Sequence, residues 1–283
     1  MTDFNNKVVV ITGAASGIGR GIAEKCAKEG MRVVLSDIEE KALSQTEENL
    51  NTIGAEVLSV VADVSKIDDV ENLAQKTLER FGAVHLLVNN AGVGFGTKTS
   101  TNIWEYPLAD WEWILGVNVW GVIHGIHVFV PIMLKQDIEC YIVNTASMAG
   151  LITPVLGVGI YSITKHTVIA ISESLNHELQ RLGSKIKVSA LCPGFVITNL
   201  TESERNRPEE LQYDIKTNPE FDQIIKVYQQ SIESGITPEQ VADKLFQAIK
   251  EGKKFYIPTD HLIFLRKNVK IRMEAILKDL QKD

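Results

Sequence analysis

The first 30 residues of this 283-residue chain combine a short strand, a glycine turn and a helix, and this unit limits the possible folds most. Residues 8–11 are a β-branched run, typical of a strand buried on both faces. Three glycines follow within residues 12–19, and apolar residues then recur at helical spacing. Such a turn holds a pyrophosphate against the helix N-terminus, so we expect a dinucleotide rather than an empty turn. The residues expected to bind it are Gly13, Ser16, Gly17, Ile18 and Gly19.

The same alternation of strand and helix continues along the chain. Further strands are expected at residues 32–35, 55–62 and 84–88, and helices at residues 39–51 and 67–81. Strands that alternate with helices of this length form a parallel sheet covered on both faces. The sequence therefore predicts an α/β protein with a doubly wound parallel sheet of the Rossmann type.

An acidic residue follows the second expected strand. Asp37 lies 18 residues beyond Gly19, close to where an acidic residue binds the adenosine ribose hydroxyls of a dinucleotide. A carboxylate there would repel the extra phosphate of NADP, and neither Ser16 nor Ile38 offers a positive charge to offset it. The sequence favours NAD over NADP, with a solvated turn aspartate as the plain alternative.

Polar residues and glycines gather where the expected strands end. Because ligands of open parallel sheets bind beyond the carboxyl ends of the strands, these residues should meet at one edge. They are Gly13, Asp37, Asp63, Asn90 and Ser147.

A hydroxyl, a phenol and an ammonium group suggest proton transfer at that edge. Ser147 ends an apolar run, and Tyr161 and Lys165 follow with a spacing of four residues. In a helix over residues 161–182 this spacing puts both side chains on one face. We expect Lys165 to favour the phenolate and to lower the pKa of Tyr161 towards neutrality, so that Tyr161 acts as general acid and base. Ser147 would stabilise charge on the substrate oxygen.

These residues, in this order, resemble the short-chain dehydrogenase/reductase family over about residues 5–260. The gap between the first two glycines holds three residues, as in this family, whereas the common dinucleotide fingerprint has one. The matching pieces are Thr12-Gly13-xxx-Gly17-x-Gly19, Asp63-Val64, Asn89-Asn90-Ala91-Gly92, Asn118, Ser147, Tyr161-xxx-Lys165 and Pro193-Gly194.

The resemblance implies a role for each matched residue and no metal. Tyr161 would be the catalytic acid and base, Lys165 would lower its pKa and bind the nicotinamide ribose, and Ser147 would orient the substrate oxygen. Asn118 would hold a water that connects Lys165 to solvent. The other positions would line the cofactor: Asn90 and Gly92 near the adenosine-side ribose, Asp63 and Val64 at the adenine, and Pro193, Val196 and Thr198 at the nicotinamide.

The resemblance also implies a homodimer or homotetramer, because helices around residues 111–135 and 161–182 often pair between subunits in this family. Trp111, Trp113 and Trp120 lie on the first of these expected helices. We expect them to contribute to packing rather than to a substrate wall.

Composition limits the functional class of the protein and the cellular compartment in which we expect it. The net charge of −7 and the pI near 5.5 argue against a nucleic-acid-binding surface. The three cysteines form no CxxC pair and are typical of buried thiols in a reducing compartment. No N-terminal signal region and no uncharged stretch near 20 apolar residues is present, so we expect a cytoplasmic protein. His124 and His127 have no carboxylate or thiolate close in sequence, so we expect no metal site.

Two stretches should shape the choice of substrate within one catalytic domain, residues 1–260. Residues 148–160 are almost uncharged and adjoin Ser147, which favours an apolar wall and a hydrophobic alcohol or ketone. Residues 195–235 are long and polar, and predict a lid over cofactor and substrate.

Residues 261–283 predict an amphipathic helical extension. Their apolar stripe runs from Leu262 to Leu280, and the opposite face carries more basic than acidic residues. We favour docking of this helix on the enzyme or on a neighbouring subunit. A helix on an anionic membrane surface is the alternative.

The sequence thus predicts an NAD-dependent oxidoreductase that moves a hydride between NAD(H) and a secondary alcohol or ketone. Two alternatives stay open. A 3-oxoacyl-thioester reductase is disfavoured by Asp37, because such reductases more often use NADPH. A non-catalytic NAD-sensing regulator is disfavoured by the complete set of Ser147, Asn118, Tyr161 and Lys165.

Overall fold

The computed structural model describes residues 1–94, 102–154, 158–214, 218–252 and 255–280. Parts of three stretches with expected roles lie outside the described residues. They are 155–157 of the apolar stretch, 215–217 of the expected lid and 281–283 of the C-terminal extension.

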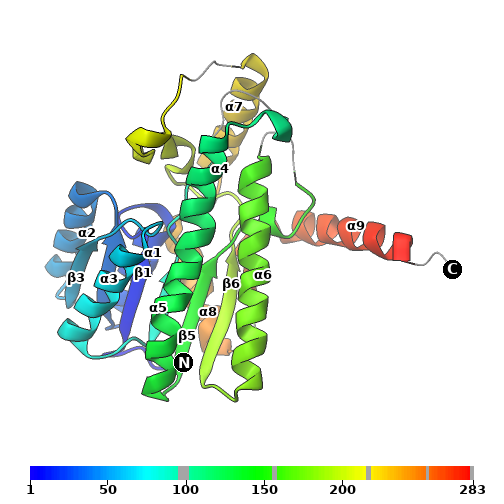
Figure 1. The fold of residues 1–283 in the computed structure, drawn as a ribbon. Helices are drawn as coiled ribbons and strands as arrows, with labels where there is room; N and C mark the ends of the chain where they lie inside the picture. Colours follow the sequence, from blue (N-terminus) through cyan, green and yellow to red (C-terminus); the bar gives the residue numbers. More distant parts are fainter. Residues whose placement is uncertain (95–101, 155–157, 215–217, 253–254, 281–283) are drawn as a thin grey trace.

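Seven strands in these ranges form one parallel sheet in the order β3-β2-β1-β4-β5-β6-β7 (Figure 1). The chain builds the sheet outward from β1 to β3 and then returns to build the other half from β4 to β7. The strand order therefore switches between β1 and β4, where ligands of such sheets bind. The strands are β1 (Val8–Thr12), β2 (Arg32–Asp37), β3 (Val57–Val61), β4 (Leu86–Asn89), β5 (Cys140–Thr145), β6 (Ile186–Cys192) and β7 (Tyr256–Pro258).

Helices cover both faces of the sheet, because successive residues of a strand point to opposite sides. Val9 and Ile11 of β1 pack with α1, α2 and α8, whereas Val8 and Val10 pack with α3, α5 and α6. The doubly wound Rossmann-type sheet predicted from the sequence is confirmed. The helices are α1 (Gly17–Lys28), α2 (Glu40–Thr52), α3 (Ile67–Phe81), α4 (Leu108–Leu115), α5 (Gly121–Gln136), α6 (Gly159–Arg181), α7 (Pro219–Glu233), α8 (Pro238–Glu251) and α9 (Leu262–Leu280).

A π-helical turn (Gly116–Trp120) joins α4 and α5 into one helical stretch, Leu108–Gln136. Against the sequence expectation, this stretch is long and apolar enough to cross a membrane by length and composition alone. Phe129, Val130 and Met133 on its inner side are buried in the core. We therefore interpret it as a core helix with an apolar outer face. Figure 1 shows α5 and α6 side by side on this side of the molecule.

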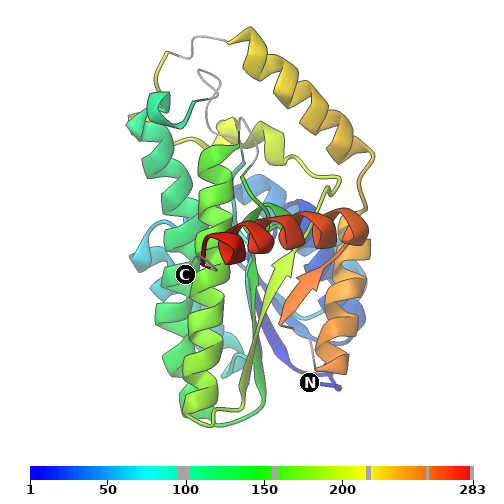
Figure 2. The same ribbon diagram turned by 90° about the vertical axis from the view of Figure 1, so that its right-hand side faces the viewer.

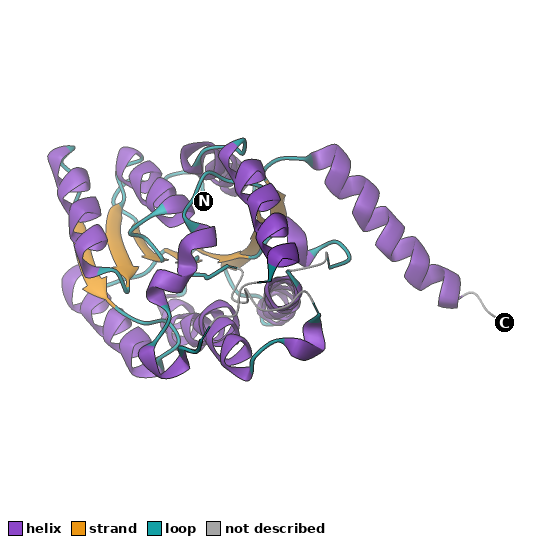
Figure 3. Cartoon of the chain, turned by 90° about the horizontal axis from the view of Figure 1, so that it is seen from above, coloured by secondary structure: helices purple, strands orange, loops and turns teal. Residues whose placement is uncertain are grey.

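The C-terminal helix α9 projects from the body of the molecule (Figures 1 and 3), and in the turned view it crosses in front of α6 (Figure 2). Its start docks as expected: Leu265 packs on Met148 and Ile152, next to Ser147. Beyond this contact the apolar stripe is uncovered, with Met273 and other apolar residues of its later turns exposed. The sequence predicted the stripe, but only its first part docks on the same chain.

Candidate active site

A cavity of about 770 Å³ opens at the carboxyl ends of the strands, and nearly all the site residues predicted from the sequence line it. Gly19 and Asn118 do not line it but lie close behind its wall, next to Gly13 and Gly92 respectively. The predicted residues that do line it are Gly13, Ser16, Gly17, Ile18, Asp37, Asp63, Val64, Asn90, Gly92, Ser147, Tyr161, Lys165, Pro193, Val196 and Thr198.

The glycine turn brings backbone, rather than side chains, to the cavity surface. Gly13 has φ +67°, and a Cβ there would lie 2.8 Å from Ala91 Cα. Gly17 has φ +52°, and its Cβ would lie 3.0 Å from Thr198 Cγ2. The first turn of α1 holds no acidic residue, and the Ser16 side chain makes no capping hydrogen bond. This helix N-terminus is therefore suited to an anionic pyrophosphate.

Asp37 is held rigidly at the end of β2. The Ala15 N–H donates to its Oδ2 and the Glu39 N–H to its Oδ1, each at 3.0 Å. Burial raises the pKa of Asp37, and these two backbone hydrogen bonds oppose the rise. The remaining lone pairs of a fixed carboxylate can accept from two neighbouring ribose hydroxyls.

Asn90 ties together the ends of three strands beneath the cavity. Its Nδ2 donates to Thr12 O at 3.0 Å and to Gly13 O at 3.2 Å, and Thr145 Oγ1 donates to its Oδ1 at 3.3 Å. The side chain has little freedom left for a ligand. We infer that Asn90 shapes the cavity floor.

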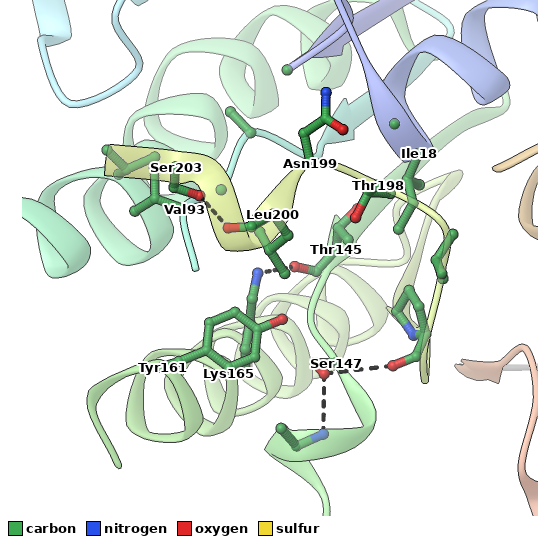
Figure 4. A pocket seen from close by; sticks show the side chains of 18 of the residues that line it. Ile18, Val93, Thr145, Ser147, Tyr161, Lys165, Thr198, Asn199, Leu200 and Ser203 are labelled. Carbon is green, nitrogen blue, oxygen red and sulfur yellow. Dashed lines mark hydrogen bonds between the residues drawn. The ribbon is translucent and has the colours of Figure 1, made fainter. Parts of the chain in front are cut away.

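Ser147, Tyr161 and Lys165 converge at one wall of the cavity (Figure 4). Ser147 lies beyond β5, and its Oγ accepts from Ala149 N at 3.1 Å. Tyr161 and Lys165 come from the first turns of α6, with Lys165 Nζ 5.6 Å from the Tyr161 ring centroid. Lys165 Nζ donates to Thr145 O at 2.9 Å. Helix α6 and strand β5 together produce the geometry predicted from the sequence.

The pKa of Tyr161 differs from the sequence expectation. Burial raises it to about 12, and the hydrogen bond with Ser147 offsets only part of that rise. Burial also lowers the pKa of Lys165 to about 8. The expected shift of Tyr161 towards neutrality fails because desolvation penalises the phenolate and because the ammonium is directed at the Thr145 carbonyl. The residues of the chain thus keep the Tyr161 phenol protonated at neutral pH.

Asn118 sits behind this wall with its side chain fully engaged. Its Nδ2 donates to Val93 O at 3.0 Å and to Thr164 Oγ1 at 3.1 Å, and its Oδ1 accepts from Val93 N at 2.8 Å. A Cβ on Gly92 would lie 3.3 Å from Asn118 Oδ1 and 3.5 Å from Lys165 Nζ. Glycine therefore lets Asn118 and Lys165 approach each other.

A lid segment, residues 200–213, is fastened over the cavity by buried polar contacts. Ser203 Oγ accepts from Gly94 N at 3.0 Å. Arg207 Nη2 donates to Asp110 Oδ1 of α4 at 2.6 Å, and its guanidinium stacks over the Trp113 ring at 4.3 Å. Tyr213 Oη donates to the same carboxylate at 2.9 Å. Sequence reasoning missed this cluster, because its partners lie about a hundred residues apart.

The opposite wall is mostly apolar and comes from late parts of the chain. Helix α7 supplies Ile224, Val227 and Ile232, and α9 supplies Phe264. Trp113 also lines the cavity, although the sequence favoured packing for it; it does both, since it is buried against the cluster around Ile114. Ile224, Val227 and Tyr228 of this wall have i, i+3 and i, i+4 spacing, which was a signal that could have marked it.

Comparisons with known proteins agree with this arrangement. The family model described as short chain dehydrogenase matches residues 7–209. A short chain dehydrogenase/reductase from Burkholderia phymatum, solved in complex with NAD, is 45% identical with a TM-score of 0.92, covering 100% of this chain and 98% of that one. A "CLA biosynthesis dehydrogenase/reductase" from Lactiplantibacillus plantarum is 38% identical, covering 92% of this chain and 90% of its own length. A 1-deoxy-11-beta-hydroxypentalenate dehydrogenase from Streptomyces avermitilis is 36% identical, with coverages of 68% and 69%.

Proposed function

The chain belongs to the short-chain dehydrogenase/reductase family of oxidoreductases, and we propose that it transfers a hydride between NAD(H) and a secondary alcohol or ketone. The observation that carries this proposal is a single cavity with a dinucleotide-type turn and Asp37 at one end and Ser147, Tyr161 and Lys165 at the other. Proton transfer and cofactor binding are thereby served by one site.

Tyr161 is the general acid and base of this reaction. In reduction, the phenol donates its proton to the carbonyl oxygen as the carbonyl carbon receives a hydride; in oxidation, the phenolate accepts the hydroxyl proton. Ser147 donates a hydrogen bond to the same substrate oxygen. Lys165 Nζ donates to the Thr145 carbonyl beside the phenol, and it would bind the nicotinamide ribose of the cofactor. Asn118, whose side chain is held by Val93 and Thr164, would hold a water that connects Lys165 to solvent.

The residues present fit a dinucleotide. Gly13 and Gly17 bring backbone to the cavity surface, and the α1 N-terminus would supply hydrogen-bond donors for the phosphates. When bound, the nicotinamide accepts or donates the hydride. Asp37 would hold the adenosine ribose hydroxyls, which favours NAD. The Burkholderia phymatum relative in complex with NAD supports this choice.

The substrate is a hydrophobic alcohol or ketone. This follows from the apolar wall formed by Ile224, Val227, Ile232 and Phe264, next to Met148 and Ile152. Residues 195–235 serve as the substrate lid, and residues 1–260 form the catalytic domain. A 3-oxoacyl-thioester fits the same apolar wall, and Asp37 remains the argument against it.

The enzyme acts as a homodimer or homotetramer in the cytoplasm. The apolar outer face of Leu108–Gln136, with Trp120 53% exposed, lies beside α6 and supports a subunit contact there. The uncovered part of α9 offers a further apolar surface. All three cysteines are free and buried, which suits a reducing compartment.

The test is absorbance at the reduced-nicotinamide band. NAD and NADP are screened against secondary alcohols of increasing apolar size, and NADH and NADPH against the matching ketones and 3-oxoacyl thioesters. The proposal expects NAD-linked turnover that improves with apolar size. Activity that is confined to NADPH and acyl thioesters would contradict it.

A further inference from the structure

A positively charged side chain lines the end of the cavity where Asp37 lies and where we expect the adenosine of the cofactor. The residue that carries it lies far from Asp37 in the sequence. Positions 16 and 38 offer no positive charge, but Arg205 of the lid segment reaches the same end of the cavity. Among the described lining residues, Arg205 and Lys165 are the two Lys or Arg side chains, and Lys165 lies at the Tyr161 end. Arg205 is therefore the cation placed near the ribose that Asp37 would bind.

Arg205 is held by an acidic residue two positions beyond Asp37. Its Nη2 and Nε donate to Glu39 Oε1 at 2.7 and 3.1 Å, and Asn206 Nδ2 donates to the same oxygen at 2.8 Å. Its Nη1 donates to Glu202 O at 2.9 Å. We call Glu39, Arg205 and Asn206 the Glu39 clasp. It joins the turn after β2 to the lid across the cavity edge.

The clasp keeps its charges paired at neutral pH. Burial alone would raise the pKa of Glu39, but the hydrogen bonds from Asn206 and Arg205 outweigh it, and the net pKa is lowered. The Glu39 N–H also donates to Asp37, so that both carboxylates are fixed on one turn. The side chains of Arg205 and Glu39 remain 36% and 29% exposed, so a ligand phosphate can reach them.

We propose that Glu39 is a positioning residue for cofactor choice, which excludes NADP by holding the Arg205 guanidinium away from the 2′-phosphate. An arginine at this end of the cavity would otherwise bind that phosphate in a bidentate manner. Asp37 selects NAD by direct contact with the ribose, whereas Glu39 acts through Arg205. This inference rests on the proposed use of NAD, and it adds Glu39 to Asp37 as a second residue that favours NAD over NADP.

Calorimetric titration with NAD and with NADP tests the clasp without any need for a substrate. Glu39→Gln removes the charge that holds Nε and Nη2 of Arg205, while Nη1 keeps its contact with Glu202 O, and should tighten NADP binding by about tenfold, as expected for one charge-assisted contact at a partly exposed site. Glu40→Gln is the matched control, because Glu40 is exposed, begins α2 directly after Glu39 and does not line the cavity. It should leave NADP binding unchanged.

Two double variants test whether Arg205 causes the gain in NADP affinity. Glu39→Gln with Arg205→Gln should lose the gain in NADP affinity. Glu39→Gln with Arg205→Lys keeps the charge but not the planar fork, and should keep less than half of the gain in binding free energy.

An unchanged NADP affinity in Glu39→Gln, or a gain shared by Glu40→Gln, would overturn the clasp as a selector. A full gain retained with Arg205→Lys would overturn it in favour of net charge alone. These outcomes differ from failure of the proposed function, which would appear as wild-type protein that does not bind NAD in the same titration.

Discussion

Asp110→Asn removes the charge from a fully buried carboxylate and leaves Arg207 without its closest counter-charge. The two side chains are 0% and 3% exposed, and Nη2 lies 2.6 Å from Oδ1. Breaking such a pair by altering one partner costs about 3–5 kcal/mol. Glu204 also accepts from Arg207 and offsets part of that cost, so we expect the free energy of unfolding to fall by about 2–3 kcal/mol.

The matched control is Glu204→Gln. Glu204 accepts from the same guanidinium, with Oε2 2.8 Å from Nε, but its side chain is 22% exposed. Water therefore screens this contact, and the expected loss is below about 1 kcal/mol. The two variants differ mainly in the burial of the carboxylate that they neutralise.

Urea unfolding followed by circular dichroism measures both losses, and thermal unfolding should show Asp110→Asn lower by about 4–8 °C. Because Asp110 anchors the lid segment to α4, the same variant should also raise KM for the alcohol. If Asp110→Asn lowered the free energy of unfolding by no more than Glu204→Gln does, this would refute the reasoning that burial sets the strength of the Asp110–Arg207 ion pair.

Three further predictions follow from other parts of the molecule. Gly17→Ala places a Cβ 3.0 Å from Thr198 Cγ2 at a φ of +52°, and should weaken NAD binding in calorimetry by more than tenfold while the far-ultraviolet spectrum is kept. A pKa of Tyr161 raised to about 12 keeps the phenol protonated, so alcohol oxidation, which needs the phenolate, should accelerate as pH rises from 7 to 10, whereas ketone reduction should stay nearly constant; a flat pH profile for chemistry-limited oxidation would contradict this sign. Met273→Lys with Ile276→Lys places charge on the exposed stripe of α9; if the stripe forms a subunit contact, light scattering should show a smaller assembly, and an unchanged mass would exclude that contact.

The sequence was sufficient for the sheet and for most of the site, because parallel strands place their carboxyl ends at one edge. Asp37 ends β2 and Ser147 follows β5, so topology alone places both at the same edge of the sheet. Helical spacing likewise placed Lys165 beside Tyr161.

The missed features depend on contacts between distant segments. Arg205 and Glu39 are 166 residues apart, and no local pattern links them. The pKa of Tyr161 depends on how deeply the folded chain buries the phenol, which spacing does not reveal. The stripe of α9 indicated an apolar face, but periodicity alone does not say what covers that face.

The most direct test of the central claim compares Tyr161→Phe with wild type in NAD binding and in turnover. The variant keeps the ring and loses only the proton-transferring hydroxyl, which serves the chemistry and not the binding of the cofactor. Calorimetry should therefore give an NAD affinity within about twofold of wild type, while kcat falls by about 10²–10⁴-fold. Turnover close to that of wild type would contradict the role of Tyr161 as the acid and base.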